Sequence, residues 1–114
     1  MVDIKSILEE GVRVIKVVGD VDASSSIKLD SELKGAIEGV DKKILVDCTR
    51  LNYISSAGLG VFMSYIQDIT DKEIRLVIYG LNDKVKNVFE ILGLGQLLTI
   101  ENNLETAKAY LNEV

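Results

Sequence analysis

The sequence predicts a single α/β domain over residues 1–114, with a mixed, mostly parallel sheet of about five strands packed with about four helices. Short β-branched runs alternate with helix-length segments, which is typical of parallel strands joined by crossover helices. A Glu10-Gly11 pair between the first two runs indicates an opening antiparallel hairpin. The length matches one domain with one hydrophobic core.

The hairpin strands are predicted over residues 4–9 and 12–18, which are strand-length and rich in β-branched side chains. We expect residues 19–22, Gly-Asp-Val-Asp, to end the second strand. A serine among residues 24–26 then caps a helix, and Gly39 closes that helix. The opening of the chain is therefore predicted as a hairpin followed by a helix.

The central strand is predicted over residues 42–49, because Ile44-Leu45-Val46 is short, β-branched and flanked by charged residues. A polar turn over residues 47–52 is expected to end it. The next helix is predicted over residues 56–70, where apolar residues recur every three or four positions. We expect Leu51, Tyr53 and Ile54 to fill the space between this strand and this helix.

The start of that helix holds an unusual set of small residues. Ser55 or Ser56 can cap it, because a serine hydroxyl accepts a hydrogen bond from an unpaired N–H of the first turn. Gly58 and Gly60 each cost about 1 kcal/mol against alanine inside a helix. Close packing of a strand, or close approach of a protein partner, would offset that cost.

The remaining elements follow the same alternation. In chain order we predict a strand over residues 74–79 closed by Gly80, a helix capped by Asn82 or Asp83, a C-cap at residues 93–95, a short strand over residues 97–100, and a peripheral helix opened by Asn103.

Composition excludes several classes of function. The net charge of -5 argues against direct nucleic-acid binding, and no apolar run is long enough to cross a membrane. Without histidine, a Ser-His-Asp triad and the usual histidine-bearing zinc sites are excluded. Cys48 is the only cysteine, so we expect a cytoplasmic protein in which Cys48 packs in the core.

Residues 47–61, with the segment S-S-A-G-L-G, resemble the signature of the anti-sigma factor antagonist family, the STAS domains. The resemblance extends to residues 19–22 and to the late Val85, Phe89, Leu92-Gly93-Leu94 pattern, and so covers essentially the whole chain. It implies a phosphorylated serine at Ser56. Many members carry aspartate where this chain has Ser55, which leaves Ser55 as the alternative acceptor. The implied surroundings of the phosphorylation site, or contacts for the partner, are Asp22, Ser55, Ala57, Gly58, Leu59 and Gly60.

The resemblance implies a regulatory protein and not an enzyme. The unphosphorylated form would bind an anti-sigma factor with serine kinase activity and release the sigma factor, and phosphorylation of Ser56 by that partner would end the binding. A phosphatase would act on the same serine. ATP would be bound by the partner, because this chain has no G-x-x-x-x-G-K motif, and no cofactor is expected.

Asp22 has two compatible interpretations. An aspartate after glycine commonly stabilises a turn or a helix cap. The resemblance places it beside the phosphorylated serine, where it would bond to the hydroxyl or the helix start and oppose a second negative charge. Of the apolar residues near the helix start, Tyr53, Leu59 and Met63 are candidates for docking, although a core position is the expected one for each.

Two other functions remain open at this stage. A STAS chain can serve as a scaffold, a sensor or a transport accessory subunit in a larger assembly. The alternative of another class is a small nucleotide-binding or anion-binding enzyme that uses residues 55–60 as an anion cradle, with Lys84 and Lys86 as the nearest plausible cations. The charge pattern does not determine an oligomeric state.

Overall fold

The computed structural model describes residues 2–113 and contains one mixed sheet of five strands in the order β1-β2-β3-β4-β5. β1 pairs antiparallel with β2, and the other neighbouring strands are parallel. The predicted fold class is confirmed. The strands are β1 (Val2–Glu9), β2 (Val12–Val21), β3 (Lys43–Ile54), β4 (Arg75–Tyr79) and β5 (Thr99–Glu101).

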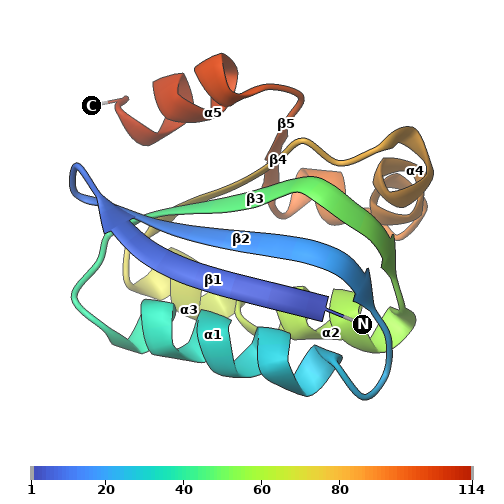
Figure 1. Cartoon of the computed structure of the whole chain (residues 1–114). Helices are drawn as coiled ribbons and strands as arrows, with labels where there is room; N and C mark the ends of the chain where they lie inside the picture. The colour runs from blue at the N-terminus through green and yellow to red at the C-terminus, as the bar shows by residue number, and fades with distance from the viewer. Residues whose placement is uncertain (1, 114) are drawn as a thin grey trace.

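The helices are distributed unequally over the two faces of the sheet. In Figure 1, α1, α2 and α3 lie below the sheet, whereas α5 lies above it. The unequal cover leaves part of the upper face, over β1 and β2, open to solvent. The helices are α1 (Ser26–Glu38), α2 (Ser56–Ser64), α3 (Ile66–Asp71), α4 (Asp83–Ile91) and α5 (Leu104–Leu111), with a short 3-10 helix, η1 (Leu94–Gln96).

The helix predicted over residues 56–70 is divided at Tyr65 into α2 and α3. The Tyr65 N–H donates to the Phe62 carbonyl at 3.2 Å, three residues back, which tightens the last turn of α2. The Tyr65 hydroxyl donates to the Asp30 carboxylate of α1 at 2.6 Å. This contact between Tyr65 and α1 fixes the position of the residue at which α2 ends. It could not be predicted from the spacing of apolar residues.

Alternate residues of the central strands enter two separate apolar clusters. Ile15 and Val46 belong to the larger cluster, which the sheet forms with α1, α2 and α4. Val14 and Leu45 belong to the smaller cluster beneath α5. Both faces of the central strands are therefore buried, as is usual for parallel strands.

Two strands run well past the C-terminal ends that the sequence predicted for them. β2 does not end at residue 18 but continues to Val21, and β3 does not end in a turn over residues 47–52 but continues to Ile54. Register shifts near Gly19, which has φ of +100°, keep the two strands paired past the local irregularity. Pairing between strands overrides the local turn signal here. It brings Val21 and Ile54 together as neighbours at the end of the sheet.

The predicted packing of residues 51–54 is partly correct. Leu51 and Ile54 are buried, but Tyr53 is 51% exposed and pairs with the exposed Asp20 of β2. The register shift between Gly19 and Asp20 leaves Asn52 unpaired and interrupts the alternation of side chains after Leu51. Ile54 therefore points into the core, and its neighbour Tyr53 points away from it. The prediction that Tyr53 fills the space next to the helix is therefore wrong.

Candidate functional site

Ser55 joins the start of α2 to the end of β2. Its Oγ accepts a hydrogen bond from the Gly58 N–H at 3.3 Å, so Ser55 is the N-cap of the helix. Its own N–H donates to the Val21 carbonyl at 2.8 Å. Ser55 is only partly exposed. Both its backbone and its hydroxyl thus serve to fix the helix start against the sheet.

Ser56 is the first residue of α2 and is exposed, as is Ala57 after it. Within residues 2–113, no protein group hydrogen-bonds to the Ser56 hydroxyl, in contrast to that of Ser55. A helix start carries unpaired N–H groups and the positive end of the helix dipole, which favour an anion. The position therefore combines access for a modifying enzyme with a backbone that tolerates added negative charge.

Gly58 provides the close packing that the sequence suggested. A Cβ built on Gly58 would lie 2.7 Å from Cγ1 of Ile54 and 2.9 Å from Cγ1 of Val21. Gly58 therefore lets the first turn of α2 rest directly on the ends of β2 and β3. Val21 and Ile54 were not predicted as part of the site, because their contact depends on a strand register that spacing alone does not reveal.

Leu59 and Gly60 differ in accessibility. Leu59 is 2% exposed and lies in the larger apolar cluster, so it supports the helix from below. Gly60 is exposed, and a Cβ built on it would meet no atom within 4 Å. Of the residues predicted around Ser56, Gly58 and Leu59 face the core, whereas Ala57 and Gly60 face solvent.

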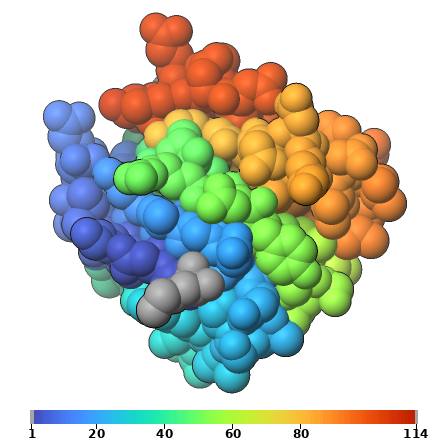
Figure 2. Space-filling view, turned by 45° about the vertical axis from the view of Figure 1, so that its right-hand side comes forward, coloured from blue at the N-terminus to red at the C-terminus, as the bar shows by residue number. Residues whose placement is uncertain are grey.

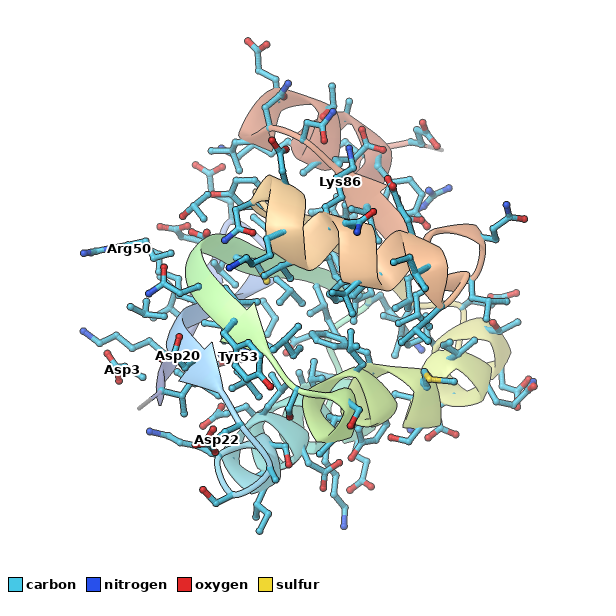
Figure 3. The ribbon with its side chains drawn as sticks, turned by 90° about the vertical axis from the view of Figure 1, so that its right-hand side faces the viewer. Asp3, Asp20, Asp22, Arg50, Tyr53 and Lys86 are labelled. Carbon is cyan, nitrogen blue, oxygen red and sulfur yellow. The ribbon has the colours of Figure 1, made fainter. Side chains whose placement is uncertain are left out.

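Asp22 stabilises the turn that opens α1. Its Oδ1 accepts hydrogen bonds from the Ser25 N–H at 2.8 Å and from the hydroxyls of Ser25 and Ser24, both at 2.9 Å. Within the described residues it makes no hydrogen bond to Ser55 or Ser56. It nevertheless directly follows Val21, the residue bonded to the Ser55 N–H, and Figure 3 shows it at the loop between β2 and α1. The turn interpretation is thus confirmed, with Asp22 one residue from the contact that anchors α2.

These hydrogen bonds, chiefly those from Ser25, lower the pKa of Asp22 from 3.8 to about 2. We expect the Asp22 carboxyl to titrate near pH 2 in a carbon-detected NMR titration. Since the folded-state pKa is lowered, the stabilising contribution is present above about pH 4 and disappears as the pH falls toward 2. Ser25→Ala removes the Ser25 hydroxyl but keeps the Ser25 N–H, the largest cause of the lowered pKa, so the midpoint should move only part of the way up toward 3.8. An unchanged midpoint in that variant would show that the Ser25 hydroxyl does not contribute to the lowered pKa.

Two of the apolar candidates for docking are exposed. Tyr53 is 51% exposed and Met63 is 49% exposed, so the core position expected for each is wrong, whereas that expectation is confirmed for Leu59. Figure 3 shows Tyr53 beside Asp20 at the end of the sheet. Figure 2 shows the end of β2, the start of α1 and the residues before α2 meeting on one face. The Ser56 region is therefore bordered by accessible polar and apolar groups.

Of the two lysines considered for an anion-binding enzyme, Lys86 is engaged by another side chain. The Lys86 ammonium group donates a hydrogen bond to the Asn102 side-chain oxygen at 2.9 Å.

Cys48 is buried, and that burial raises the pKa of its thiol, which confirms its predicted place in the core. Among residues 2–113 there is no group of three or more acidic or cysteine side chains placed to hold a metal ion. No helix in the same range is long and apolar enough to span a membrane.

A family model described as the STAS domain matches residues 4–107. The chain belongs to the STAS domain family. The match covers the hairpin from residue 4, the serine pair and the start of α5, so the matched region includes residues of all five strands and the Ser56 region described above. The resemblance drawn from the S-S-A-G-L-G segment is therefore confirmed.

Related proteins agree with this assignment. An anti-sigma-B factor antagonist of Listeria monocytogenes is 34% identical over 90 residues, which are 77% of this STAS chain and 77% of that protein. The structure of an anti-sigma factor antagonist from Mycobacterium paratuberculosis has a TM-score of 0.90 at 13% identity, covering 99% of this chain and 96% of that one. The phosphorylated form of the Bacillus cell fate determinant SpoIIAA has a TM-score of 0.70 at 18% identity, covering 96% and 98%.

Proposed function

We propose that this STAS protein is an anti-sigma factor antagonist whose binding to an anti-sigma factor with serine kinase activity is switched off by phosphorylation of Ser56. The observation that carries the proposal is the different use of the two serines. Ser55 is committed to the N-cap and to the Val21 carbonyl, whereas the Ser56 hydroxyl is exposed on the first turn of α2. This difference favours Ser56 over Ser55 as the acceptor.

The switch acts through charge and not through refolding. A phosphate adds about -1.5 to -2 charge, which the N-terminus of α2 tolerates in the free protein. In a complex, the same charge must be desolvated against the partner beside a loop that carries the ionised Asp22. Phosphorylation thus leaves the fold unchanged and lowers the affinity for the partner.

The docking surface comprises the exposed groups around the acceptor: Ala57 and Gly60 on α2, Met63 one turn further along, and Tyr53 at the end of β3. Gly60 gives a partner backbone room to approach, and Tyr53 and Met63 supply apolar area. The partner kinase binds ATP and transfers the phosphoryl group, and a phosphatase restores the binding form. The protein itself is a substrate and not a catalyst.

The test is peptide mass spectrometry of the protein purified from its own cells, followed by capture of the kinase with Ser56→Ala and Ser56→Asp. We expect a phosphate on Ser56, retention of the kinase by the alanine form, and an affinity at least about tenfold lower for the aspartate form, or about 1.4 kcal/mol. Ser64→Asp is the matched control, because Ser64 is exposed at the far end of α2. Absence of phosphate together with equal capture by both Ser56 variants would rule the switch out.

A further inference from the structure

β1 is an edge strand of unusual composition. It lies at one end of the strand order and pairs with β2 alone among the described strands. Figure 1 shows it in front of β2, with α1 beneath. Its last half carries two exposed apolar side chains, Ile7 at 45% and Leu8 at 57%. An edge of this kind offers a row of backbone donors and acceptors to a further strand.

The hairpin geometry determines which backbone groups point outward. Glu10 and Gly11 have φ of +50° and +80°, as in a two-residue type I′ turn, and Glu9 is paired with Val12 across it. The turn directs the Glu9 backbone groups toward β2. Because the direction alternates along a strand, the backbone groups of the even-numbered residues Ser6 and Leu8 face away from β2. An added strand must bond to those residues.

A second copy of β1, running antiparallel, meets this requirement only when even residues pair with even residues. One such register places Ile7 opposite Ile7 of the second copy and Lys5 opposite Glu9 of the second copy, twice by symmetry. Shifting the second copy so that Ser6 lies opposite Ser6 opposes Asp3 to Glu9. Shifting it by the same amount again opposes Lys5 to Lys5. Like charges directly opposite are destabilising, and opposite charges are stabilising. Among the registers that keep both exposed apolar residues, Ile7 and Leu8, within the paired segment, only the one with Ile7 opposite Ile7 opposes unlike charges, so the charges on β1 favour that register.

Space for this pairing exists beneath the strand. Ser6 and Leu8 face α1, and together with Ser31, Gly35 and Gly39 they line a hollow of about 580 Å³. A Cβ built on Gly35 would meet no atom within 4 Å. In the selected register, Leu8 of the second copy lies opposite Ser6 and points toward this hollow. The small residues of α1 thus leave room for the apolar side chain that the partner strand brings.

From the edge geometry, the charge pairing and the hollow, we infer that this protein forms a two-fold symmetric dimer through antiparallel pairing of residues 5–9 of β1 with the same residues of a second copy. The paired half of β1 is the half next to the hairpin turn. Ser56 lies at the opposite end of the sheet, where Val21 bonds to Ser55. The dimer consequently leaves both phosphorylation sites accessible, and it does not depend on the proposed switch.

Sedimentation equilibrium of charge variants tests the pairing. The native chain should show twice its 12.5 kDa mass at high concentration. Lys5→Glu opposes two carboxylates in each pair and should weaken the dimer at least tenfold, whereas the double variant Lys5→Glu with Glu9→Lys should restore it. Lys5 is also paired with Lys16 across β1 and β2, so Lys5→Glu relieves a repulsion within the monomer and is not expected to unfold it.

Cross-linking tests the register independently. With diamide as oxidant, Ile7→Cys should give a disulfide-linked dimer, because residue 7 meets its own copy at the two-fold axis. Lys5→Cys is the matched control and should stay monomeric on a non-reducing gel, since its partner is Glu9. Cys48 is buried and does not interfere. A single-copy mass at every concentration, no restoration by the double variant, or equal cross-linking of both cysteine variants would overturn the dimer.

Discussion

Replacing Gly80 with alanine is expected to lower the free energy of unfolding by about 2–5 kcal/mol, the sum of a left-handed backbone cost and an overpacking cost. Gly80 follows β4 and has φ of +80°. A Cβ there would lie 2.4 Å from Cγ2 of Thr49 and 3.1 Å from the Thr49 backbone N and Cα. Thr49 lies within β3 between Asp47, which pairs with both β2 and β4, and Arg50, which pairs with β2, and these paired neighbours limit how far its backbone can yield. The substitution therefore strains two strands at once.

Gly11→Ala is the matched control for this prediction. Gly11 has the same φ of +80°, but its added Cβ would meet no atom within 4 Å. Gly11→Ala should therefore lower the free energy of unfolding only by the cost of a left-handed backbone at alanine, about 1–2 kcal/mol. Urea unfolding of both variants separates the two contributions, because a change in midpoint at constant slope reports stability. Equal losses in the two variants would show that the Thr49 contact adds nothing.

The order of helices and strands could be predicted from the sequence because each depends on a local pattern. Apolar spacing, β-branched runs and caps such as Asn82 and Asn103 are read along the chain, and both asparagines accept the cap hydrogen bond from a backbone N–H of the following helix. The ends of β2 and β3 could not be predicted in this way. Their last residues pair with each other across register shifts, and that pairing is a property of two segments far apart in sequence.

The same distinction applies to the candidate site. The S-S-A-G-L-G segment was sufficient to predict a helix start with an accessible serine, since capping is a local property. Which serine caps the helix depends on the Val21 carbonyl, and which glycine is packed depends on Ile54, neither of which lies within that segment. The exposure of Tyr53 and Met63 was missed for a related reason. An apolar residue at a site of interaction has the same local pattern as one in the core.

Gly58 and Gly60 should respond to alanine with opposite signs, although both lie in α2. Replacing glycine with alanine inside a helix raises the free energy of unfolding by about 0.5–1 kcal/mol. Gly60→Ala should show this gain, because the added Cβ would meet no atom within 4 Å. At Gly58 the added Cβ overlaps with Val21 and Ile54, which are both buried, and overpacking costs about 1–3 kcal/mol. The net effect of Gly58→Ala is therefore a loss.

Partner binding should follow a different order from stability. Gly60→Ala places a methyl group on the accessible side of α2, where the proposed kinase docks, so we expect a more stable protein that binds the kinase more weakly. Thermal unfolding and titration calorimetry on the same samples measure both quantities. Since a purely structural role for Gly60 predicts unchanged or stronger binding, undiminished affinity in Gly60→Ala would remove this residue from the docking surface. Loss of affinity in a stabilised variant has no explanation in the fold alone and would locate the partner at the first two turns of α2.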